Sequence, residues 1–250
     1  MSEPQLFYKK SWTRFLPVFV GALFVVMLAA IIGRTVFGVA PLSAFMVFSI
    51  SLLLCLLSML MGFLVLLWGF IAGKKNILRN GAAMLGLAVL PVAISVLVLG
   101  PKNLTAPPIH DITTDTKAPP FFSIAPKNRT EKQNSLDYGG KEIAEIQKAA
   151  YPDIQPIVTE MAPERAFARC QAVVDKLGWE ILEADPAAAV IEAVDSTRVF
   201  NFKDDIAIRV QGTGHGSRID IRSVSRDGKG DFGTNANRIR RFIKAFNAAG

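Results

Sequence analysis

The chain has 250 residues, of which 28 are Lys or Arg and 21 are Asp or Glu, giving a net charge of +7. A hydrophobic fraction of 51% and a charged fraction of 20% exclude an intrinsically disordered chain, which is poor in apolar residues. Residues 1–100 hold seven cations and one acid, whereas residues 101–250 hold 21 cations and 20 acids. The excess charge therefore belongs to an apolar arm rather than to a soluble basic face, and no nucleic-acid partner is expected.

Three stretches of this arm are apolar enough to span a bilayer, which takes roughly 20 residues. The first covers about residues 15–33. The second covers about residues 42–72 and follows Pro41, which suits the first turn of a helix. The third covers about residues 81–100 and contains Pro91, which spanning helices tolerate. We therefore expect three transmembrane helices and a lipid bilayer as their partner.

The cations beside the spans predict the orientation, because short loops rich in Lys and Arg stay in the cytoplasm. Only Arg34 lies in the first loop. The other cations of the arm precede the first span or separate the second from the third: Lys9, Lys10, Arg14, Lys74, Lys75 and Arg79. The pattern predicts a multi-pass protein of the cell inner membrane, with its N-terminus in the cytoplasm and residues 101–250 in the periplasm.

Two other arrangements stay open. The first span could be a cleaved signal peptide, although its apolar stretch is long for that role. The second span could be two, which would move the C-terminal segment to the cytoplasm, although the stretch has no polar turn at its centre. None of the spans contains an ionisable Asp, Glu, Lys, Arg or His, and this argues against a transporter.

A proline-rich segment and then a folded domain follow the spans. Residues 101–126 contain six prolines, which disfavour a helix or a central strand. We therefore expect residues 101–140 to form a linker and extended arm. From residue 141 onward, helical and extended periodicities alternate. They predict helices at 141–150, 163–177 and 232–246 and strands at 154–159, 179–184, 190–194, 206–210 and 219–221. This order predicts an α+β envelope domain over residues 141–250, with helices covering an antiparallel sheet.

Several motifs of this region are shared with a known family. They are IHDITTD at 109–115, PPF at 119–121, YPDIQP at 151–156, LGWEI at 177–181, FKDDIAIRV at 202–210, and SRIDIRSVSR with DFGTNANRIRRF within 217–242. Through them, residues 109–246 resemble the bacterial family called domain of unknown function 1499. Because that family has no established activity, the resemblance implies a domain but no chemistry.

A polar set in and beside the predicted sheet is the candidate binding site. Its members are Asp204, Asp205, Arg209, Arg222, Arg226, Asp231 and Asn235, with His110 and Asp111 as linker residues that can dock onto them. Asp220, Arg222 and Arg226 share strand parity and so project from one face. Carboxylates and guanidiniums together can hold an anionic headgroup or a peptide carboxylate, or they can pair structurally and pin the last helix to the sheet. Both interpretations stay open.

The sequence offers no metal or catalytic set. Its two histidines and two cysteines do not provide the three or four clustered ligands of a zinc site. The glycine-rich loop at 212–217 precedes a strand and predicts a hairpin rather than a phosphate-binding loop. We expect no metal and no cofactor.

The expected function is therefore binding of a lipid, a peptide or a protein at the cell envelope, without catalysis. An envelope protein and an anionic lipid are the partners considered. One alternative is an envelope hydrolase that uses Asp204 or Asp205 as a general base. Another is an accessory subunit of a membrane complex, held by the long second helix.

Overall fold

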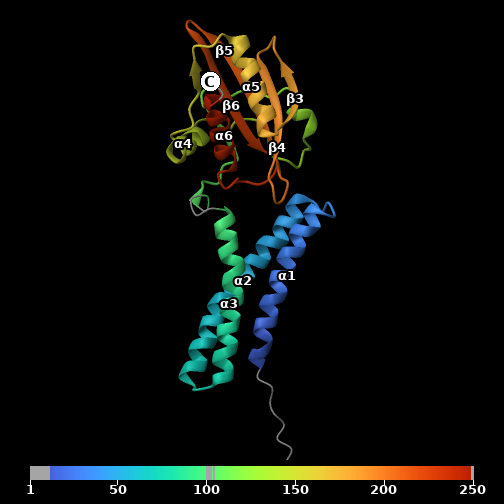
Figure 1. The fold of residues 1–250 in the computed structure, drawn as a ribbon, viewed down its shortest axis with the longest axis vertical. Helices are drawn as coiled ribbons and strands as arrows, with labels where there is room; N and C mark the ends of the chain where they lie inside the picture. The colour runs from blue at the N-terminus through green and yellow to red at the C-terminus, as the bar shows by residue number, and fades with distance from the viewer. Residues whose placement is uncertain (1–11, 100–102, 104, 249–250) are drawn as a thin grey trace, which may run out of the picture. The chain divides into compact units, whose positions relative to one another are not determined.

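The chain folds into two compact units, Met1–Pro101 and Lys102–Gly250, and each is described by itself (Figure 1). The computed structural model describes residues 12–99, 103 and 105–248. Lys9 and Lys10, which entered the orientation argument, lie outside these residues, as does the end of the third predicted span at Gly100.

The first unit contains the three predicted spans as helices. They are α1 (Phe15–Thr35), preceded by the 3-10 helix η1 (Trp12–Arg14), α2 (Pro41–Ile71) and α3 (Lys75–Leu99). All three are long and apolar enough to cross a membrane. The third helix begins six residues before the predicted span. Its first turns carry polar residues that a helix tolerates but that an apolar span excludes, namely Lys75, Asn76, Arg79 and Asn80.

Glycines allow α2 and α3 to pack closely against each other. A Cβ atom on Gly81 would lie 2.5 Å from the backbone nitrogen of Leu66, and one on Gly69 would collide with the backbone of Leu78. Small residues at such crossings let two helix backbones approach each other in a bilayer, where packing rather than the hydrophobic effect drives association. The α2–α3 hairpin is thus specified by its glycines.

The second unit is an α+β domain, as predicted. Its sheet has the order β1-β6-β5-β4-β3, with β2 also paired to β6, and every pairing is antiparallel. The strands are β1 (Asp111–Thr113), β2 (Ile157–Thr159), β3 (Glu180–Asp185), β4 (Val190–Ser196), β5 (Lys203–Thr213) and β6 (Gly216–Ser225). The helices are α4 (Gly140–Ala150), α5 (Pro163–Leu177) and α6 (Thr234–Ala248), with the 3-10 helix η3 (Ala125–Asn128).

The main hydrophobic core lies between one face of the sheet and helices α5 and α6 (Figure 1). Alternate residues of β5 and β6, such as Ile208 and Ile221, point into it and are buried. Trp179 stacks on Phe242 with ring centroids 5.9 Å apart. Gly178 ends α5 in the left-handed conformation, with φ of 72°, as its position after the helix predicts.

The opposite face of the sheet is covered by residues 115–138, a segment of the predicted linker. Phe122 and Ala125 pack there on Ala207 and Val224 and form a second small core. The buried carboxylate of Glu192 accepts hydrogen bonds from the backbone N–H groups of residues 123–125.

This differs from the expectation of a linker and extended arm over 101–140, because the second compact unit is Lys102–Gly250 and β1 is a strand of its sheet. The prolines disfavour long helices and central strands, but they permit a short edge strand, the 3-10 helix η3 and an irregular covering layer. We call residues 115–138 the covering arm.

Candidate functional site

Two adjacent aspartates of β5 face opposite sides of the sheet, because side chains alternate along a strand. Asp204 points to the helices, and its carboxylate lies 2.6 Å from a guanidinium nitrogen of Arg238 on α6. Asp205 points to the covering arm, where it pairs with Arg129 and Arg226, each at 2.7 Å. The two candidates therefore belong to two separate networks.

The helix-side network continues into α6. Ser223 donates a hydrogen bond to the amide oxygen of Asn235 at 2.6 Å, and Arg238 donates to that same oxygen at 2.7 Å. Asp231 accepts bonds from the backbone N–H groups of Gly233 and Asn235 and so caps the helix. Burial raises the pKa of Asp231, and these N–H bonds only partly oppose the rise. This side of the set holds α6 on the sheet.

The arm-side network ties β1 and the covering arm to β6. Arg222 binds both carboxylate oxygens of Asp111, at 3.0 and 2.6 Å, and donates its other N–H groups to the carbonyls of Pro120 and Leu136. Arg209 contacts Asp115 and Asp220, both at 3.1 Å. These guanidiniums bind carboxylates of the domain itself.

His110 joins the helix-side network through its backbone carbonyl. Its carbonyl accepts hydrogen bonds from Asn235 and from the N–H group of Ser225, and its ring nitrogen Nδ1 lies 3.4 Å from the carbonyl of Lys229. The linker residues His110 and Asp111 thus do dock onto the polar set, as considered from the sequence. They join it as structural partners.

The structure supports the structural interpretation of the candidate set. It brings Asp111, Asp205, Arg209, Arg222 and Arg226 to one face, and Asp204, Asp231 and Asn235 to the other. Asp204 is 2% exposed and Asp205 is fully buried. A general base must reach the substrate proton, whereas both carboxylates are buried in ion pairs.

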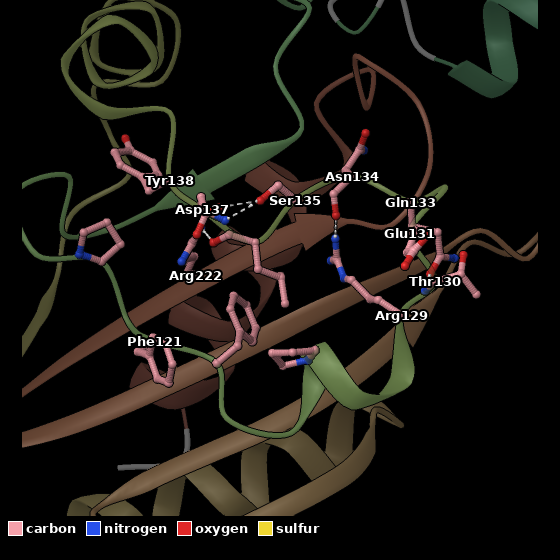
Figure 2. A pocket seen from close by; sticks show the side chains of 14 residues that line it. Phe121, Arg129, Thr130, Glu131, Gln133, Asn134, Ser135, Asp137, Tyr138 and Arg222 are labelled. Atoms are coloured by element: carbon pink, nitrogen blue, oxygen red, sulfur yellow. Dashed lines mark hydrogen bonds between the residues drawn. The ribbon is translucent and has the colours of Figure 1, made fainter.

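A different site lies on the outer side of the covering arm. It is an open groove of about 680 Å³. Its lining residues are Pro119, Phe121, Phe122, Pro126, Arg129, Thr130, Glu131, Gln133, Asn134, Ser135, Leu136, Asp137, Tyr138 and Arg222. Figure 2 shows Phe121 and Tyr138 on one side of the groove, with Arg222 between them. Only Arg222 belonged to the sequence-derived set, and the PPF motif was the signal that could have pointed here.

The two guanidiniums in the groove are both ion-paired with buried aspartates. Arg129 pairs with Asp205, and Arg222 pairs with Asp111. The Arg222 guanidinium also lies 5.2 Å from the ring centroid of Phe122 and 5.6 Å from that of Tyr138, in cation–π geometry. Together with their hydrogen bonds to backbone carbonyls, these interactions show that the two arginines hold the covering arm in place.

The accessible chemistry of the groove is apolar and acidic. Phe121 is 78% exposed, a large fraction for an aromatic side chain. Glu131 and Asp137 are exposed carboxylates on the lining. The hydroxyl of Tyr138, by contrast, is buried without a hydrogen-bond partner among the described residues, and burial raises its pKa to about 12.

No group of three or more His, Cys, Asp or Glu side chains that could hold a metal ion occurs in the described part of the chain. Residues 111–246 match the protein family described as Protein of unknown function (DUF1499), which confirms the resemblance drawn from the motifs at 109–246. No curated protein matches the chain.

Proposed function

The chain belongs to the DUF1499 family, and we propose that it is a membrane-anchored protein whose C-terminal domain binds an extended segment of a protein partner, without catalysis. The groove on the covering arm supports this proposal more than any other feature. Its apolar wall includes an aromatic side chain, Phe121, that is 78% exposed. Exposed apolar surface of this kind, rimmed by polar residues, is typical of interaction sites.

The charges of the groove favour a protein segment over an anionic lipid. A lipid phosphate needs a free cation, but both arginines of the groove pair with buried aspartates. The charged groups left exposed on the lining are Glu131 and Asp137. A segment with apolar side chains beside Lys or Arg therefore complements the groove in both polarity and sign.

As part of the same proposal, the protein lies in the inner membrane, with its N-terminus on the cytoplasmic side and its C-terminal domain in the periplasm. The described cations of the first unit support this orientation, because all except Arg34 lie at one end of the helix bundle, which we call the basic end. Asn80 of α3 donates a hydrogen bond to Thr13, just before α1, at 2.9 Å, and so holds the starts of these two helices together. The residues of the basic end are Arg14, Lys74, Lys75 and Arg79.

A periplasmic reporter tests the orientation. Alkaline phosphatase fused after Gly250 folds only after export, so we expect an active fusion at that position and an inactive one in the loop at Gly73. The reverse pattern, or an inactive fusion after Gly250, contradicts the proposed compartment.

Selection from a displayed peptide library tests the binding proposal. The full chain, held in phosphatidylcholine nanodiscs, should enrich peptides that combine apolar side chains with Lys or Arg. Phe121→Ala should weaken the selected peptides by about tenfold to a hundredfold, the value of burying one Phe side chain. Val158→Ala is the matched control, because Val158 is 75% exposed and lies outside the groove lining.

Two results would contradict the binding proposal. One is a library that yields no peptide dependent on Phe121. The other is a selection dominated by acidic peptides, because Glu131 and Asp137 should repel them. The accessory-subunit alternative stays a prediction, since no described feature of α2 favours a protein over lipid as its neighbour.

A further inference from the structure

The basic end of the membrane arm has no counter-charge among the described residues 12–99. The sequence contains no Asp or Glu between Glu3 and Asp111, so residues 12–99 hold no carboxylate. The four side chains of the basic end are exposed. Elsewhere in the described chain, by contrast, guanidiniums such as Arg129 and Arg222 pair with nearby carboxylates.

A hollow at the turn between α2 and α3 concentrates this charge. It has a volume of about 370 Å³ and is lined by Lys74, Lys75, Asn76 and Ile77. The first turn of α3 contributes the positive end of its helix dipole at the same place. Arg79 follows one turn later on α3 and is exposed.

An aromatic side chain near the hollow favours a position at the depth of lipid headgroups. Trp68, near the end of α2, is 45% exposed, and its ring centroid lies 5.9 Å from the ammonium of Lys74. Tryptophan prefers the boundary between hydrocarbon and water, and lysine beside it reaches toward phosphate. Basic pockets formed by spanning helices at this depth suit anionic headgroups.

We propose that the hollow binds the headgroup of an anionic phospholipid, with Lys74, Lys75 and Arg79 as the cations that hold its phosphate. The phosphate supplies the counter-charge that residues 12–99 lack. A zwitterionic lipid is a poorer ligand because its own ammonium group competes for the phosphate. This inference is independent of peptide binding by the C-terminal domain, since it concerns another surface of the chain.

Native mass spectrometry of the purified full chain in a neutral detergent tests this proposal. Phosphatidylglycerol and phosphatidylcholine are titrated separately, and the bound lipids are counted. The test variant combines Lys74→Gln, Lys75→Gln and Arg79→Gln. The matched control combines Lys117→Gln, Lys127→Gln and Lys132→Gln, which removes the same charge from three exposed lysines of the other unit. Working in detergent separates lipid binding from the effect of these cations on membrane insertion.

The wild-type chain should bind phosphatidylglycerol in preference to phosphatidylcholine. Each cation near a headgroup is worth about a fivefold change in affinity, so the test variant should lose on the order of a hundredfold and the control should lose none. Equal losses in the two variants would overturn the proposal, because they would show binding by net charge alone. Displacement of the lipid by an equal concentration of inorganic phosphate, or the absence of any headgroup preference, would overturn it as well.

Discussion

The substitution Asp205→Asn should release the covering arm while leaving the helix side of the domain in place. Asp205 is fully buried and accepts hydrogen bonds from Arg129 at 2.7 Å and from Arg226 at 2.7 and 3.1 Å. Asparagine has nearly the same shape, so the change removes a charge without opening a cavity. The arm-side network loses its central anion, and both guanidiniums stay buried.

The magnitude follows from the burial of those guanidiniums. The side chains of Arg129 and Arg226 are 6% and 9% exposed. Burial lowers the pKa of Arg129, and the charge of Asp205 opposes that shift, so Asp205 offsets part of the cost of desolvating Arg129. Removing one partner of a buried ion pair costs about 3–5 kcal/mol, a large part of the about 5–15 kcal/mol that stabilises a typical domain.

Hydrogen exchange measured by mass spectrometry on the full chain provides the assay. If the arm opens locally, a cost of about 3 kcal/mol makes amides of residues 123–136 exchange on the order of a hundredfold faster. Amides of α6 should change little, because Asp204 and Arg238 still hold that helix.

Asp153→Asn is the matched control. The two carboxylate oxygens of Asp153 also accept hydrogen bonds from one guanidinium, that of Arg240, at 2.6 and 2.8 Å. The side chain of Asp153 is 53% exposed, however, and that of Arg240 is 39% exposed. Such an exposed pair is worth about 1 kcal/mol or less. If Asp205→Asn and Asp153→Asn cost the same, or if exchange in residues 123–136 is unchanged, the arm is not held by Asp205 and the reasoning is refuted.

Three further results are expected. Gly81→Leu should lower the melting temperature of the full chain in detergent, because a side chain there meets the backbone of α2, whereas Gly86→Leu has open space and should not. Glu192→Gln should destabilise the arm by about 1.5–3 kcal/mol for each weakened charged hydrogen bond to residues 123–125, again measured by exchange. Burial raises the pKa of Cys170 to about 12, so alkylation of its thiol at pH 9 should require unfolding. Because the thiol ionises near pH 9 in the unfolded chain, the free energy of unfolding should fall as the pH rises from 9 toward 12. Rapid labelling of the folded chain would contradict this.

The regular elements were predictable because their signals are local. Pro163 at the start of α5 and Gly178 at its end fix that helix within the sequence itself. The alternation of Ile206 and Ile208 similarly predicts β5 and its buried face. The three spans were equally clear, since length and composition alone define them.

The covering arm was not predictable because it has no period. Residues 115–138 are held by contacts distant in sequence, such as Arg129 with Asp205 and Ser123 with Glu192. No local pattern announces such contacts, and proline-rich sequence fits a free linker as well as an irregular layer. The groove was missed for the same reason, since it lies on a segment whose position depends on those contacts.

The candidate site from the sequence was attractive because charged side chains in strands are unusual, but their place in the fold gives them a structural role. Asp204 and Asp205 are neighbours in sequence and lie on opposite faces of β5, where one anchors α6 and the other anchors the covering arm. The sheet is covered on both faces, and these two aspartates supply one buried ion-pair attachment on each. Because these charges form that attachment, the proposed binding of a partner depends on the exposed surface of the covering arm, above all on Phe121.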